Sequence, residues 1–145
     1  MKIKVEEKKN LSEIEVLISC PVINDEVNRV VKLLETSSLS IMGKLNGENY
    51  VLTLDQIFYF EAVDNHVFAY CEKEIYEVNY KLQELTELLS QTYFIQTART
   101  IVLNIKQIKK VTTLVNGRIL AVLNNGEKMI ITRVYAQKFK QKLKE

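Results

Sequence analysis

Polar and apolar residues alternate along most of the chain after about residue 40, the period-two pattern of strands that bury one face. β-branched and aromatic residues fill these runs, and short polar segments separate them. The pattern predicts strands over residues 41–45, 50–54, 57–62, 67–71, 75–79, 101–103, 108–115, 118–123 and 128–132.

Asn-Gly pairs fall between several of these runs, at residues 46–47, 116–117 and 125–126. Asn followed by Gly readily supplies the two positive φ angles of a tight hairpin turn. We therefore expect short connections and antiparallel strands.

Two segments of the same region have a helical period instead. Asn79 is placed to cap a helix over residues 81–90, whose core face would be Leu82, Leu85 and Leu89. A last helix would begin at Val134, with apolar residues at four-residue spacing: Tyr135, Phe139 and Leu143. The expected class is mainly β (α+β), with one short internal helix and a C-terminal helix.

The first 43 residues have a different pattern. Residues 2–5 and 13–16 alternate at period two on either side of a polar stretch, which predicts a short hairpin. Asn24 can cap a following helix that has acidic residues in its first turn and one apolar stripe, formed by Val27, Val30, Val31 and Leu34. We expect a small ββα unit over residues 1–43 and a second unit over residues 44–145.

The net charge of +2 conceals a strong asymmetry along the chain. Residues 94–145 hold 11 basic and two acidic residues, a net charge of +9, whereas residues 1–93 carry −7. The basic part can attract a polyanion such as nucleic acid. Alternatively, its lysines only solvate strand faces and the last helix.

Few residues suit catalysis or metal binding. His66 is the only histidine, and no serine, cysteine or carboxylate pair flanks it at a catalytic spacing. Cys20 and Cys71 are far apart and lack partners at metal spacing, so we expect buried or half-buried thiols, with no metal site and no cofactor. The chain also lacks an apolar run of membrane-spanning length or a signal peptide. We therefore expect a cytoplasmic protein that is not an enzyme.

The segment YFIQTARTIVLNI, residues 93–105, places polar residues among apolar ones as the chain enters its core. Arg99 can grip a guanine edge or a phosphate, and Gln96 can pair with adenine. Thr97 and Thr100 can donate hydrogen bonds to phosphates. Alternatively, the threonines and Arg99 form the outward face of an edge strand, and a bend explains the spacing of the inward residues, Phe94, Ala98 and Val102.

From about residue 44 to residue 143 the chain resembles the LytTR domain, the mainly β DNA-binding module of bacterial transcription regulators. Four segments carry the resemblance in the family's order: LDQIFYFEAVDNHVFAY, IYEVNYKLQELTELL, FIQTARTIVLNIKQIKKV and GEKMIITRVYAQKFKQKL. The family pattern of roughly Phe-x-Arg-x-His-Arg-Ser is matched at Phe94, Arg99 and Thr100. Where the family has a basic residue this chain has Gln96, and where the family has a polar residue it has Ala98. These differences affect the strength or base preference of DNA contact rather than the fold.

The resemblance implies an elongated stack of small antiparallel sheets whose loops, and not a recognition helix, enter successive major grooves of double-stranded DNA. Arg99 and Thr100 would lie on one loop, and Arg133 on a second. His66 would reach DNA from a third loop, or hydrogen-bond within it. Asn104 would tie a backbone turn. Nearby lysines would add phosphate charge without reading sequence, namely Lys106, Lys109, Lys110, Lys138 and Lys140.

The first 43 residues are too few for the phosphorylated receiver domain that many LytTR regulators carry. They resemble the start of compact LytTR regulators, which are often encoded beside a small membrane protein that restrains them. This segment can cap the module or pair with a second protomer. We expect a homodimer, because paired half-sites raise the affinity of a small module.

Two functions remain open on the sequence. The first is a sequence-specific bacterial transcription regulator. The second is a protein-interaction module whose basic half has only non-specific affinity for polyanions. RNA binding is a poorer interpretation, because Phe58, Tyr59 and Phe60 are consecutive and point to both faces of their strand.

Overall fold

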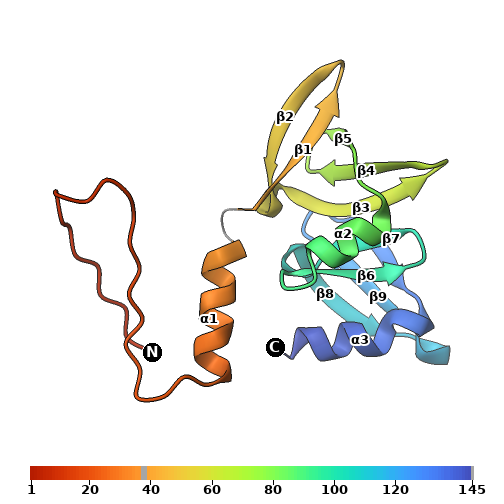
Figure 1. Ribbon diagram of the computed structural model, residues 1–145. Coiled ribbons are helices and arrows are strands. Elements are labelled where there is room, and N and C mark those ends of the chain that lie inside the picture. The colour runs from red at the N-terminus through yellow and green to blue at the C-terminus, as the bar shows by residue number, and fades with distance from the viewer. Residues whose placement is uncertain (37–38, 145) are drawn as a thin grey trace.

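The computed structural model of the protein describes residues 1–36 and 39–144 (Figure 1). Its strands are β1 (Ser40–Leu45), β2 (Glu48–Thr53), β3 (Ile57–Val63), β4 (His66–Cys71), β5 (Ile75–Val78), β6 (Phe94–Ala98), β7 (Ile101–Asn104), β8 (Ile108–Thr113), β9 (Ile119–Leu123) and β10 (Lys128–Ile131). Its α-helices are α1 (Asp25–Thr36), α2 (Leu82–Leu88) and α3 (Arg133–Leu143). The 3₁₀ turns are η1 (Leu54–Gln56), η2 (Ile105–Gln107) and η3 (Val115–Gly117).

The predicted mainly β, antiparallel class is confirmed. Backbone hydrogen bonds join seven strands into one sheet, in the order β2-β1-β5-β4-β3-β7-β6, and three strands into a second sheet, in the order β10-β9-β8. Every strand pair is antiparallel. In Figure 1 the β1–β2 ribbon stands at a steep angle to β3 and β4, so the larger sheet twists strongly along its length.

Two of the three Asn-Gly pairs form the turns that the sequence predicts. Asn46 and Gly47 have φ angles of 53° and 81°, and Asn116 and Gly117 have φ angles of 64° and 76°. In the third pair only Gly126 has a positive φ, of 89°. That turn is closed by hydrogen bonds from the N–H of Gly126 to the carbonyl of Leu123 and from the N–H of Leu123 to the carbonyl of Glu127.

The first two helices start differently from each other. Asn24 caps α1 as predicted, because its Oδ1 accepts a hydrogen bond of 3.0 Å from the N–H of Val27. The prediction that Asn79 caps the next helix is wrong. α2 begins at Leu82, and its first turn is closed by the Glu84 carboxylate, which accepts from the N–H of Lys81 at 2.8 Å.

No helix in the described residues is long and apolar enough to cross a membrane.

The predicted hairpin at the start of the chain is wrong. Residues 1–24 contain no strand, although the N–H of Leu11 does bond to the carbonyl of Lys8 at 3.3 Å, closing a turn where one is expected. A two-stranded ribbon is marginal unless its apolar face is covered. The apolar residues of both predicted strands are exposed, with exposed fractions of 92% at Val5 and 93% at Ile14. Figure 1 shows α1 beside the sheets rather than on them.

The buried side chains form three clusters. In the first, Leu85 of α2 and Leu89, which follows the helix, cover one face of the larger sheet. In the second, Phe139 of α3 packs on the smaller sheet and on Ile95 of β6. The third lies between the sheets and includes Tyr59, whose hydroxyl donates to the Glu127 carboxylate at 2.9 Å. Burial, followed by this hydrogen bond, raises the pKa of the Tyr59 phenol.

β3 is covered on both faces, which explains why residues 57–60 are all buried instead of alternating. Ile57 and Phe60 belong to the cluster under α2, and Phe58 and Tyr59 belong to the cluster between the sheets. Phe58, Tyr59 and Phe60 are 6%, 6% and 0% exposed. They therefore offer no platform on which RNA bases could stack.

Asn104 has the structural position that the sequence suggests. Its side chain is 1% exposed and lies where β7 ends. Its Nδ2 donates to the carbonyls of Ile57 and Leu54, at 2.9 and 3.4 Å, and its Oδ1 accepts from the N–H of Lys106 at 3.0 Å. One amide thus ties the turn before β3 to the turn before β8.

We expect Asn104→Ala to lower the free energy of unfolding by about 1–3 kcal/mol, because buried backbone groups lose their partner. Urea unfolding followed by circular dichroism measures the effect. Asn49→Ala on β2 is the matched control, since Asn49 is exposed and its loss should change stability by less than about 0.5 kcal/mol. Equal stability of the two variants would contradict the role of Asn104.

Candidate nucleic-acid interface

β6 is an edge strand, one of the two interpretations that the sequence left open, and a bulge interrupts it. Gln96 pairs with Val102 of β7 and Ala98 pairs with Ile101, so Thr97 is the extra residue on its strand. The bulge explains the irregular spacing of apolar residues around Arg99. It also buries the Thr97 side chain, which is 1% exposed.

The turn after the bulge presents Arg99 and Thr100, and both residues are exposed. Two hydrogen bonds fix its backbone. The Gln96 side chain donates to the carbonyl of Arg99 at 3.3 Å, and the carbonyl of Thr100 accepts from the N–H of Ala62 at 2.9 Å. The second bond joins this turn to the end of β3.

The start of α3 lies against the same strand. The N–H of Thr132, just before α3, donates to the carbonyl of Thr97 at 3.0 Å. Arg133 is the first residue of α3 and is exposed. The bulge therefore brings Arg99 and Arg133, which are 34 positions apart in the sequence, to neighbouring loops of one surface.

A third loop continues this surface. Asp64 and Asn65 connect β3 to β4 with φ angles of 50° and 67°, and Val63 pairs with His66 across the turn. Because Ala62 bonds to Thr100, the tip of this hairpin lies next to the Arg99 turn. We call the surface formed by residues 64–66, 99–100 and 132–133 the loop edge. Its three parts follow one another down the right side of Figure 1.

His66 is exposed and makes a specific contact. Its Nδ1 lies 3.3 Å from Oε1 of Glu77 on β5, and the two side chains are 60% and 44% exposed. It borders an open groove of about 610 Å³ whose walls carry both signs of charge, from Lys44, Lys81, Glu77 and Glu84. The mixed charge gives this groove no preference for an anion.

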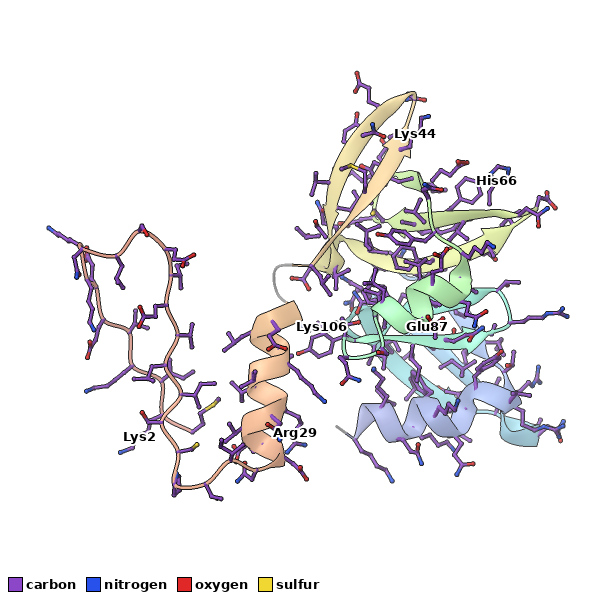
Figure 2. All side chains as sticks on the ribbon, viewed as in Figure 1. Lys2, Arg29, Lys44, His66, Glu87 and Lys106 are labelled. Atoms are coloured by element: carbon purple, nitrogen blue, oxygen red, sulfur yellow. The ribbon has the colours of Figure 1, made fainter. Side chains whose placement is uncertain are left out.

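The other predicted DNA contacts are placed less favourably. Thr97 is buried, so its hydroxyl cannot reach a phosphate, and that prediction is wrong. Gln96 is half-buried and holds the Arg99 carbonyl. Figure 2 shows Lys106 on the opposite side of the molecule from His66, and its Nζ lies 4.0 Å from the centre of the Tyr93 ring.

Lys109 and Lys138 are both exposed. Lys109 lies near the start of β8, at the opposite end of that strand from η3. Lys138 is in the middle of α3, past the helix start that carries Arg133. Both can contribute positive charge near a bound polyanion, but neither lies on the loop edge.

Sequence reasoning did not assign a role to the turn between β8 and β9. Gly117 in this turn lies against the side chain of Arg133: a Cβ built on Gly117 would be 3.1 Å from Arg133 Cγ. The Asn116-Gly117 pair predicts the turn, but nothing in the sequence predicts its contact with α3. Arg118, which follows, is a further exposed cation.

The loops around the two arginines carry no acidic residue in residues 97–100, 115–118 or 130–133. In residues 1–36 and 39–144 there is also no group of three or more histidine, cysteine or acidic side chains that could hold a metal ion.

Cys20 is exposed, contrary to expectation, and Cys71 is half-buried as expected. Burial raises the pKa of the Cys71 thiol to about 11, so it stays protonated and unreactive near neutral pH.

The loop edge carries two exposed arginines, Arg99 and Arg133, together with Asp64 and His66 in its third turn. The family model of the LytTr DNA-binding domain matches residues 47–144. The chain therefore belongs to the LytTr DNA-binding domain family, which is a family of DNA-binding modules rather than of enzymes.

Two known proteins resemble the chain. One solved structure is the LytTr DNA-binding domain of a protein described as a methyl-accepting/DNA response regulator from Bacillus cereus. It has a TM-score of 0.67 and 25% identity, and the match covers 72% of this chain and 95% of that one. The sensory transduction protein LytT of Enterococcus faecalis (strain ATCC 700802 / V583) is 26% identical over 101 residues. That match covers 68% of this chain but only 42% of the relative.

Proposed function

We propose that the protein is a sequence-specific bacterial transcription regulator that inserts the turns of the loop edge into successive major grooves. The observation that supports this most directly is the pair of backbone hydrogen bonds, Ala62 to Thr100 and Thr132 to Thr97, which align three exposed turns. A scaffold fixed by backbone bonds keeps the spacing between turns constant. Constant spacing is what successive grooves of a duplex require.

In this proposal the two arginines read bases. Arginine can donate two parallel hydrogen bonds to O6 and N7 of guanine in the major groove. Thr100 donates to a phosphate, and His66 contacts DNA at the outer turn when it is not engaged by Glu77. Lys109 and Lys138 add charge without specificity, and we place Thr97 and Lys106 outside the contact surface.

We expect Arg99→Ala and Arg133→Ala each to weaken specific DNA binding by about 1–3 kcal/mol while the fold stays intact. Fluorescence anisotropy measures the binding, with a labelled duplex from upstream of the gene, a scrambled duplex as competitor and several salt concentrations. Circular dichroism and urea unfolding check the fold.

The matched control is Lys73→Ala. Lys73 is an exposed cation in the turn after β4, at the opposite end of that strand from His66, and its loss should leave specific binding unchanged. If the scrambled duplex competes equally well and both arginine variants bind as before, the proposal is wrong. The protein-interaction module, with only non-specific affinity for polyanions, would then be the better account.

We also propose that the protein is a homodimer joined through its N-terminal residues. Ile3, Val5, Ile14 and Val16 are apolar, and no strand pairing covers them in residues 1–24. These residues are 58–93% exposed. A second copy of this segment would remove these apolar side chains from water.

We expect the mass measured by sedimentation equilibrium to be twice the 16.9 kDa of one chain, and Ile14→Lys to lower it toward that of the monomer. A buried lysine in each copy would be strongly unfavourable. Glu13→Gln, a polar change at the neighbouring exposed residue, is the control and should leave the dimer intact. A monomer at all concentrations for the unchanged protein would contradict the dimer.

Two further proposals rest on the family resemblance. We propose that the protein acts in the cytoplasm. We also propose that a small membrane protein restrains it by binding the same apolar N-terminal residues. Ile14→Lys would then release the regulator from that restraint as well as from the dimer.

A further inference from the structure

The side chain of Arg133 lies along the backbone of a turn from another part of the chain. η3 connects β8 to β9, and Gly117 at its end has a φ of 76°. A Cβ built on Gly117 would lie 3.1 Å from Cγ, 3.4 Å from Cδ and 4.0 Å from Cβ of Arg133. A side chain at position 117 would therefore crowd the aliphatic part of the arginine and displace it by a few tenths of an ångström.

This contact fixes the direction in which the guanidinium leaves α3. Arg133 is the first residue of the helix and is exposed, so its long side chain would otherwise have many rotamers. The backbone of Arg133 is held by the bond from Thr132 to Thr97, and η3 supports the stem of its side chain. A base contact needs its donors within about 0.5 Å of the productive position.

We infer that Gly117 is a positioning residue for Arg133, and that the β8–β9 turn sets which base pair this arginine reads. The inference rests on the proposed function, because it assumes that Arg133 contacts DNA. Two properties favour glycine at position 117. It permits the positive φ, and it leaves room for the arginine stem.

The chain contains a close control for the first of these properties. Asn46 and Gly47 form the same dipeptide with φ angles of 53° and 81°, close to the 64° and 76° of Asn116 and Gly117. A Cβ on Gly47 would meet no atom within 4 Å. Gly47→Ala thus carries the same backbone strain as Gly117→Ala without displacing an arginine.

The test uses the full chain and a duplex that the unchanged protein has enriched from a randomised pool. We expect Gly117→Ala to weaken binding by about 3- to 10-fold, less than the loss from removing the whole side chain in Arg133→Ala. It should also flatten the preference at one base pair while leaving the salt dependence unchanged. Urea unfolding should show that both glycine variants lose a similar amount of stability. Gly47→Ala should nevertheless bind the duplex as the unchanged protein does.

The variant that combines Gly117→Ala with Arg133→Ala decides between positioning and direct contact. If Gly117 acts through the arginine, the double variant should bind as Arg133→Ala alone. An additive loss would overturn the inference, because the turn would then touch DNA itself. Normal binding by Gly117→Ala, with weakened binding by Arg133→Ala, would also overturn the inference. The proposed function would stand in that case. Normal binding by Arg133→Ala would also overturn the inference, and the proposed function would fail with it only if Arg99→Ala bound normally and the scrambled duplex competed equally well.

Discussion

The carbonyl oxygen of Thr97 accepts a hydrogen bond from the N–H of Thr132 at 3.0 Å, and the geometry of the loop edge depends on this contact. The bond forms because the bulge in β6 turns Thr97 out of register with β7. It fastens the start of α3 to the larger sheet, and Phe139 then secures the helix on the smaller one. Together with the packing of Phe139 on Ile95 of β6, it holds the start of α3 near the turn that carries Arg99.

Most of the fold follows from local rules that can be applied to the sequence directly. The Asn46-Gly47 and Asn116-Gly117 turns have the backbone that this dipeptide favours, and Asn24 caps α1 as its side chain allows. The predictions fail where tertiary contacts, rather than local sequence, determine the structure. β6 lacks the regular alternation of apolar and polar residues that marks a strand, because a bulge interrupts it. Residues 2–5 and 13–16 alternate like strands but lack a covering surface, and hydrogen bonds alone do not hold a two-stranded ribbon.

The candidate site divides in the same way. Arg99, Thr100 and Arg133 were identified by resemblance to the family, and the structure brings their turns together. Thr97 was misplaced because the sequence does not show that the bulge buries it. The contact of Gly117 with Arg133 joins two turns distant in sequence, and no periodicity or composition signals such an approach. The sequence predicted Arg99 and Arg133 as DNA contacts, whereas the structure shows which backbone turns carry them.

The most direct test of the account is amide hydrogen exchange, measured by mass spectrometry with and without the duplex enriched by the protein. The account predicts that DNA slows exchange together in residues 63–66, 98–101 and 131–134, because one rigid edge enters successive grooves. Exchange in β2, at the far edge of the larger sheet, should not change. Protection confined to one of these turns, or spread evenly over the basic residues of β8 and α3, would contradict a single loop edge.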